Sequence, residues 1–172
     1  QYRKVLSVLR TRINVLEKLM SENRWSEIEY DRIPSKAGLK YKNAFARRDI
    51  ERVKAGVQTY EQFAKDETKT VNAKTLYPYE VVSKAINLGG RYYRSSMPAM
   101  DDTNRLMINK YWDNLADYFN GASFNGIAVV DTSGSMVRCV TGASIYVAIS
   151  LGLYCAEKAT GPFAGHYISF AS

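Results

Sequence analysis

The spacing of apolar residues changes once along the chain, near residue 120. Before that point, apolar residues recur at every third or fourth position, as in amphipathic helices. The first such stripe comprises Leu6, Leu9, Ile13, Leu16 and Met20. Residues 126–130 (GIAVV) and 166–170 (HYISF) are instead short apolar runs typical of strands. The pattern predicts a helical region over residues 1–121 and an α/β region over residues 122–172.

Capping residues and apolar stripes predict five further helices. Serine and aspartate supply a capping oxygen. Proline is tolerated at the first helical position because a backbone N–H there has no hydrogen-bond partner within the helix. The predicted helices start at Ser35, Asp49, Pro78, Thr103 and residue 143, and the second of them continues through Phe63. The last of them lies between the two predicted strands.

A strand, a helix and a second strand in that order predict one βαβ unit with parallel strands, as in Rossmann-type sheets. Two strands alone do not form a stable parallel sheet, because both faces must be covered and the edges closed. We therefore expect this chain to be a fragment of a longer protein.

The stretch VVDTSGSM (129–136) places Asp131, Ser133 and Ser135 at alternate positions directly after the first strand. Ligands of open α/β sheets bind at the carboxyl ends of the strands. Carboxylate and hydroxyl oxygens suit hard cations such as Mg²⁺ or Mn²⁺. Two interpretations follow from the residues alone: a metal site, or a polar turn whose side chains bond the local backbone.

Catalytic sites find less support. An aspartic-protease motif has glycine two residues after its aspartate, where Ser133 stands here. Neither serine has the flanking glycines of a nucleophile elbow. His166 is the sole histidine, and we interpret it as structural. We therefore expect a protein that is not an enzyme.

The net charge of +7 is concentrated in the first third of the chain. Residues 1–54 carry 14 Lys and Arg against 7 Asp and Glu, whereas residues 101–172 carry 4 against 6. Such asymmetry fits either a polyanionic partner such as RNA or a solvated helical surface. The candidate phosphate contacts are Arg10, Arg12, Lys40, Lys42, Arg47 and Arg48.

No apolar run approaches the roughly 18 to 20 residues that a membrane span needs, so no membrane partner is expected. Cys139 and Cys155 lack the close spacing of a zinc or redox motif. We interpret them as reduced thiols of a cytoplasmic protein.

The sequence Asp131-Thr132-Ser133-Gly134-Ser135 resembles the metal-ion-dependent adhesion site of von Willebrand factor A domains. The likeness extends through GASIYVAISLGLYCAEKA and HYISFAS, and so covers residues 125–172. Upstream, MSENRWSEIEYDRIPSKAGLKYKNAF, LYPYEVV and WDNLADYF resemble an uncharacterised family (a domain of unknown function). That family joins a helical region to a von Willebrand A-like domain. Its architecture is similar to that of TROVE proteins, including the Ro autoantigen, whose helical repeats bind RNA.

The resemblance implies that Ser133 and Ser135 bind the cation directly, and that Asp131 does so directly or through water. It also implies a Thr and an Asp ligand from loops beyond Ser172. An acidic group of a protein partner then completes the coordination, which makes the site a binding module. The alternatives are a TROVE-like RNA-binding protein and a structural component of a larger assembly, such as a phage.

Overall fold

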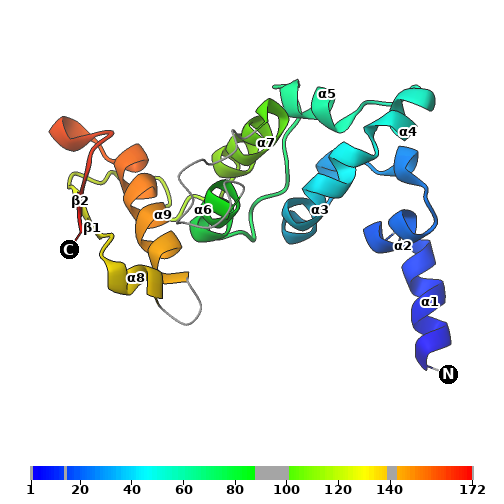
Figure 1. The fold of residues 1–172 in the computed structure, drawn as a ribbon, viewed down its shortest axis with the longest axis horizontal. Coiled ribbons are helices and arrows are strands. Elements are labelled where there is room, and N and C mark those ends of the chain that lie inside the picture. Colours follow the sequence, from blue (N-terminus) through cyan, green and yellow to red (C-terminus); the bar gives the residue numbers. More distant parts are fainter. Residues whose placement is uncertain (1, 14, 88–100, 139–142, 172) are drawn as a thin grey trace. The chain divides into compact units, whose positions relative to one another are not determined.

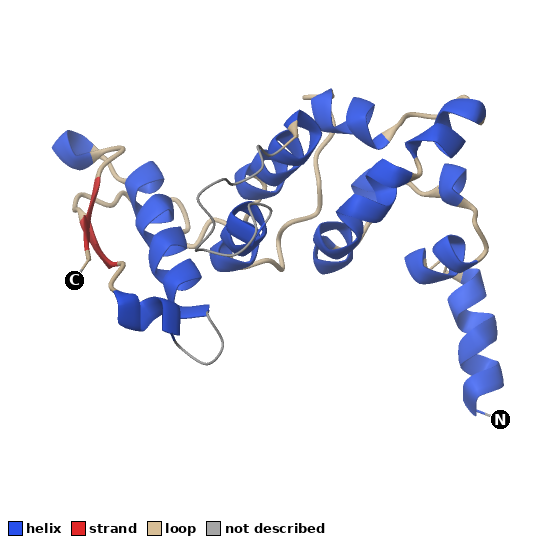
Figure 2. Ribbon diagram, viewed as in Figure 1, coloured by secondary structure: helices blue, strands red, loops and turns tan. Residues whose placement is uncertain are grey.

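The computed structural model describes residues 2–13, 15–87, 101–138 and 143–171 (Figure 1). The chain divides into two compact units, Gln1–Asn72 and Ala73–Ser172. Both units contain helices, and the strands of the described residues lie in the second unit (Figure 2). This division differs from the boundary expected at residue 121.

The elements of the first unit, among its described residues, are helices and 3₁₀ turns. Its elements are α1 (Tyr2–Arg12), α2 (Leu16–Ser21), the 3₁₀ turns Trp25–Glu27 and Tyr30–Arg32, α3 (Ser35–Arg47), α4 (Asp49–Lys54) and α5 (Tyr60–Lys65). The first apolar stripe is thus divided between two helices, with Val15 in an extended conformation before α2. The helix predicted from Asp49 through Phe63 is likewise two helices, because Gly56 adopts a left-handed φ of 66° after α4.

The capping residues of this unit act differently from the prediction. The Asp49 carboxylate accepts hydrogen bonds from the amides of Tyr60 (2.7 Å) and Glu61 (3.2 Å), so it caps α5 rather than its own helix. Thr59 completes that cap with a capping box to Gln62. The expected cap at Ser35 is wrong, since its hydroxyl donates to Asn72 Oδ1 at 3.0 Å and α3 has no side-chain cap.

An aromatic cluster forms the core of the first unit. The buried ring of Tyr30 lies 5.3 Å from Phe45, 5.2 Å from Tyr60 and 5.4 Å from Phe63, between ring centroids. Tilted and edge-on pairs at these distances stabilise the core beyond their burial of apolar area. The four residues come from the second 3₁₀ turn, α3 and α5, so the cluster joins these elements.

Arg52 of α4 is buried beside this cluster. Its guanidinium donates to the carbonyls of Gln58 (2.7 Å), Ile28 (3.0 Å) and Trp25, and lies 4.4 Å from the centroid of the Tyr30 ring. Burying a charge costs free energy unless its donors are satisfied. Arg52 therefore joins α4 to the 3₁₀ turns, which is a structural role.

The second unit contains both helices and a sheet. Its elements are α6 (Pro78–Asn87), α7 (Asp102–Asp113), β1 (Ala128–Asp131), α8 (Gly134–Arg138), α9 (Ala143–Lys158), the 3₁₀ turn Gly161–Phe163 and β2 (Tyr167–Phe170). The predicted helices at Pro78 and at residues 143–158 are confirmed. Asp101 caps α7 through the amide of Asn104 at 2.8 Å, but α7 ends at Asp113, short of the predicted Gly121.

The two strands are parallel, and their register runs from Ala128 beside Tyr167 to Asp131 beside Phe170. The βαβ arrangement predicted from sequence is therefore present. α9 covers one face of the sheet, where a Cβ added at Gly152 would lie 2.4 Å from Cγ2 of buried Val130. Glycine thus permits the close approach of α9 to β1.

On its other side α9 packs against α6. The Tyr154 hydroxyl of α9 accepts from the amide of Tyr118 at 3.0 Å and donates to the carbonyl of Ala116 at 3.2 Å. The Trp112 indole donates to Glu157 at 2.5 Å. These bonds join the end of α7 and the segment after it to α9, so the described residues between 73 and 121 belong structurally with the sheet.

Candidate metal site and basic surface

The candidate metal site begins where β1 ends. Phe170 is the last residue of β2. Its carbonyl accepts hydrogen bonds from both the amide and the hydroxyl of Thr132, each at 2.9 Å. These two bonds hold the start of the loop against the neighbouring strand. The loop therefore leaves the sheet at the carboxyl ends of both strands, the edge at which ligands of parallel sheets bind.

Hydrogen bonds bring the three predicted ligands together. The Ser133 amide donates to Asp131 Oδ1 at 2.8 Å, and the hydroxyl oxygens of Ser133 and Ser135 lie 3.0 Å apart. Ser133 is buried, Asp131 is half-buried and Ser135 is exposed. The bond from the Ser133 amide is an Asx-type turn, so the loop has the local bonding of a polar turn and also gathers three side-chain oxygens.

The separation of the hydroxyls can be compared with the geometry of a bound cation. Adjacent ligands of an octahedral Mg²⁺ ion, each at about 2.1 Å, lie about 3.0 Å apart. This value equals the Ser133–Ser135 oxygen distance of 3.0 Å. Within the described residues, no group of three or more His, Cys, Asp or Glu side chains could hold a metal. A cation at this loop would therefore depend on the hydroxyls, with Asp131 as the anionic ligand.

The charge of Asp131 suits such a role. Hydrogen bonds from the Ser133 hydroxyl and from the Ser133 amide lower the pKa of the Asp131 carboxyl below its usual value. Both bonds favour the ionised form because a carboxylate is the better acceptor. Asp131 is therefore a carboxylate at neutral pH.

The six predicted phosphate contacts do not form one patch. Arg10 and Arg12 are exposed on α1, while Lys40, Arg47 and Arg48 are exposed on α3 or directly after it. Arg48 already donates to Glu51 at 2.6 Å. Lys42 differs from the expectation: it is only 3% exposed, and its ammonium donates to Asn43 at 3.4 Å. A buried side chain does not reach a phosphate, so Lys42 is not a candidate phosphate contact.

The structure adds a basic cleft between α1 and α2 that was not predicted. It encloses about 480 Å³ and is lined by Arg3, Ser7, Arg10, Val15, Glu17, Lys18 and Ser21. Arg3, Ser7 and Arg10 share one face of α1 because they stand four and three residues apart. That spacing is visible in the sequence, whereas the contribution of α2 depends on the break between the two helices.

The other candidate residues have no catalytic arrangement. The His166 ring nitrogen Nδ1 lies 2.8 Å from the carbonyl of Ala164, and His166 is exposed. Cys155 is a free thiol, while Cys139 lies outside the described residues. No described helix is long and apolar enough to cross a membrane.

Residues 1–122 of the chain match the family described as "Domain of unknown function (DUF2828)". The chain belongs to the DUF2828 family. This membership confirms the expected likeness to an uncharacterised family. The DUF2828 match ends before β1, so Asp131, Ser133 and Ser135 lie outside the matched residues.

The chain is also similar to "Uncharacterized protein L728" of Acanthamoeba polyphaga mimivirus. The two are 35% identical over 181 residues, which cover 99% of this chain and 29% of the viral protein. This DUF2828 chain thus spans less than a third of that relative, and the shared region includes the sheet and its loop. No solved structure matches the chain.

Proposed function

We propose that this DUF2828 chain is a non-enzymatic binding module in which Asp131, Ser133 and Ser135 hold Mg²⁺ or Mn²⁺. The sheet that carries them would belong to a von Willebrand factor A-like domain, coupled to the family's helical region. The observation that supports the proposal best is the 3.0 Å separation of the two hydroxyl oxygens beyond the carboxyl end of β1. It fits adjacent positions of an octahedral ion.

The three metal ligands favour the binding of a protein partner over catalysis. Two hydroxyls and one carboxylate supply half of an octahedral shell and a single negative charge, so the ion keeps positive charge and open positions. An acidic side chain of a protein partner is the ligand that such a site attracts. The partner would thus complete the coordination, as the resemblance to adhesion-type A domains implies.

Titration calorimetry of Mg²⁺ and of Mn²⁺ into the protein at its full natural length tests this proposal. We expect saturable binding of one ion per chain, weakened at least about tenfold in Asp131→Ala and in Ser133→Ala, because each removes a ligand. Thr132→Val is the matched control, since the Thr132 hydroxyl bonds Phe170 instead. Absence of binding, or equal binding by all three variants, would leave the loop as a polar turn.

A second candidate function is polyanion binding in the TROVE manner, and the cleft between α1 and α2 favours it. Arg3 and Arg10 line this cleft together with Ser7 and Lys18. All four side chains can donate hydrogen bonds to phosphate oxygens. Counterion release makes such binding weaken steeply with salt.

The test is the affinity for single-stranded RNA measured over a range of salt concentrations. Replacing both Arg3 and Arg10 by alanine should weaken binding and lower the salt dependence, because two phosphate contacts are lost. Arg105→Ala, which removes an exposed cation in the other unit, is the control. Equal losses from the cleft variant and the control would indicate unspecific charge attraction and reject the cleft.

A further inference from the structure

α1 leaves a row of apolar side chains uncovered. Tyr2, Val5 and Leu9 stand three and four residues apart and so share one face of the helix. They are 76%, 56% and 49% exposed, and Ile13, four residues after Leu9, is 72% exposed. Single exposed apolar residues are ordinary, but a contiguous row of them indicates an interaction surface.

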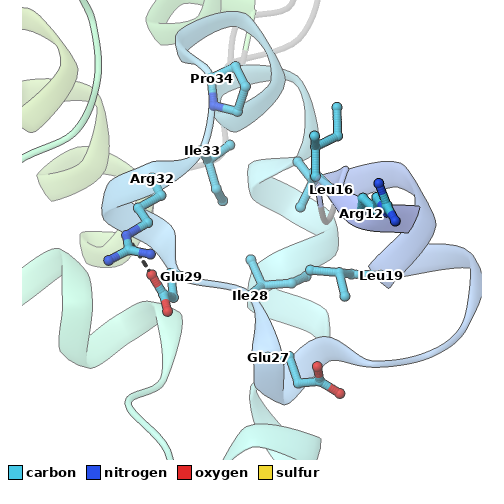
Figure 3. A pocket seen from close by; sticks show the side chains of 10 residues that line it. Arg12, Leu16, Leu19, Glu27, Ile28, Glu29, Arg32, Ile33 and Pro34 are labelled. Atoms are coloured by element: carbon cyan, nitrogen blue, oxygen red, sulfur yellow. Dashed lines mark ion pairs between the residues drawn. The ribbon is translucent and has the colours of Figure 1, made fainter. Parts of the chain in front are cut away.

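This row leads into a hollow of the same unit. Ile13 lines the hollow together with the buried side chains of Leu16, Leu19, Ile28 and Ile33, which point into it from α2 and from the segments around the second 3₁₀ turn (Figure 3). The hollow encloses about 350 Å³, within the range of ligand pockets. Ile13 belongs to both the exposed row and the hollow. The two together are called the apolar groove, defined as Tyr2, Val5, Leu9, Ile13, Leu16, Leu19, Ile28 and Ile33.

Charge around the groove selects its occupant. α1 contains Arg3, Lys4, Arg10 and Arg12 and no acidic residue. The acidic groups at the rim of the hollow are already paired: Glu29 with Arg32 at 2.7 Å, and Glu27 with Arg24. Arg12, also at the rim, has no ion-pair partner among the described residues. α1 is therefore a positive helix beside the groove, and Arg12 places a positive charge, unpaired among the described residues, at the rim of the hollow.

These properties argue against two of three simple occupants. A second copy of the chain would bring two positive helices together, which is unfavourable. A lipid surface is flat and would leave the hollow unfilled. An amphipathic helix with acidic flanks fills the hollow with an apolar side chain and places carboxylates beside the arginines.

We propose that this apolar groove binds an amphipathic helix of a protein partner, with an apolar face and acidic flanks. The helix lies along α1, and one large apolar side chain enters the hollow beside Ile13. Arg12 pairs with a carboxylate of the partner at the rim. This interaction uses none of the residues of the candidate metal site, so it is independent of metal binding.

Fluorescence anisotropy with two labelled synthetic helices tests the groove. Both peptides carry leucine at every third or fourth position; the polar positions hold glutamate in one and lysine in the other. We expect the glutamate peptide to bind at least about tenfold more tightly than the lysine peptide, because charged flanks discriminate between partners. Ile13→Asp and Arg12→Glu should each weaken binding of the glutamate peptide about tenfold.

Val53→Asp is the matched control, since Val53 is 65% exposed on α4 and lies outside the groove. Circular dichroism confirms that each variant keeps its helical content. Equal binding of the two peptides, or an equal loss in Val53→Asp, overturns the proposal. Two other results also overturn it when the glutamate peptide fails to bind. One is binding to phosphatidylserine–phosphatidylcholine vesicles that Ile13→Asp abolishes. The other is self-association in sedimentation that Ile13→Asp abolishes.

Discussion

At the scale of single residues, Ser133 favours the ionised form of Asp131. Its hydroxyl and its amide both donate to the carboxylate and lower the Asp131 pKa. A lowered pKa in the folded state means that the ionised group stabilises the fold above its unfolded-state pKa of about 3.9. That stabilisation is lost as the pH falls through the lowered folded pKa.

Ser133→Ala removes the hydroxyl donor but keeps the amide. We therefore predict that the pKa of Asp131 rises toward its usual value without reaching it. Titration of the Asp131 carboxyl carbon by NMR measures the change. Ser135→Ala is the control, because Ser135 contacts Ser133 rather than the carboxylate. An unchanged Asp131 pKa in Ser133→Ala would show that the amide alone sets it.

The sequence predicted part of these residue-level features. The sequence predicted that Asp131, Ser133 and Ser135 lie together at the end of the first strand. Their alternate spacing does not explain the approach, because Ser135 lies in α8, where the backbone is helical. The burial of Lys42 was also predictable in principle, since Lys42 stands three residues from both Leu39 and Phe45, which form the buried face of α3. The role of Asp49 was not predictable, because its partners Tyr60 and Glu61 are brought near only by the tertiary structure.

At the scale of elements, the contact between α9 and β1 depends on Gly152. At a solvent-exposed position inside a helix, Gly→Ala stabilises the protein by up to about 1 kcal/mol. Here the new methyl group would lie 2.4 Å from Val130 Cγ2, and the branching of valine restricts the rotamers by which it could move away. We predict that Gly152→Ala lowers the free energy of unfolding by about 1–3 kcal/mol, as overpacking does. Urea denaturation followed by circular dichroism measures this change.

A double variant separates overpacking from other causes. Adding Val130→Ala to Gly152→Ala removes the clashing methyl group, so the two changes should be less destabilising together than their sum. Leu151→Ala, at an exposed position of the same helix, is the matched control. Additive effects of Gly152→Ala and Val130→Ala would mean that the two residues do not meet.

Helices with clear boundary signals were the ones predicted best. α6 starts at Pro78, and α9 spans the apolar stretch predicted at residues 143–158. Helices were misjudged where an apolar stripe continued across a break, as at Val15 and Gly56. A periodic stripe reports which face is buried, but it does not report whether the backbone stays helical between its members.

At the scale of the whole molecule, the change in sequence pattern and the division of the structure fall at different places. The apolar period changes near residue 121, where strands begin to follow helices. The compact units divide after Asn72, because α6 and the segment after α7 pack against α9. Sequence pattern identifies element types, whereas unit boundaries depend on which elements pack together, so the boundary was not predictable from periodicity.

This difference predicts which fragments of the chain fold independently. A fragment of residues 73–172 keeps α6 against α9, as well as the Tyr154 bonds to Ala116 and Tyr118. A fragment of residues 122–172 loses all of these contacts and exposes the buried side of α9. We predict that the longer fragment unfolds cooperatively on heating. The shorter fragment should lack a folding transition, because two short strands with α8 and α9 bury too little apolar surface.

Thermal unfolding by circular dichroism and the dispersion of amide NMR signals measure both outcomes. Tyr154→Phe in the longer fragment serves as a graded control, since it keeps the ring and removes only the hydroxyl bonds to Ala116 and Tyr118. Its melting temperature should fall while the transition stays cooperative, because one bonded hydroxyl contributes about 1 kcal/mol. A cooperative transition in residues 122–172 alone would show instead that the sheet and α9 fold without the helices before them. The boundary expected from the sequence would then be the correct one.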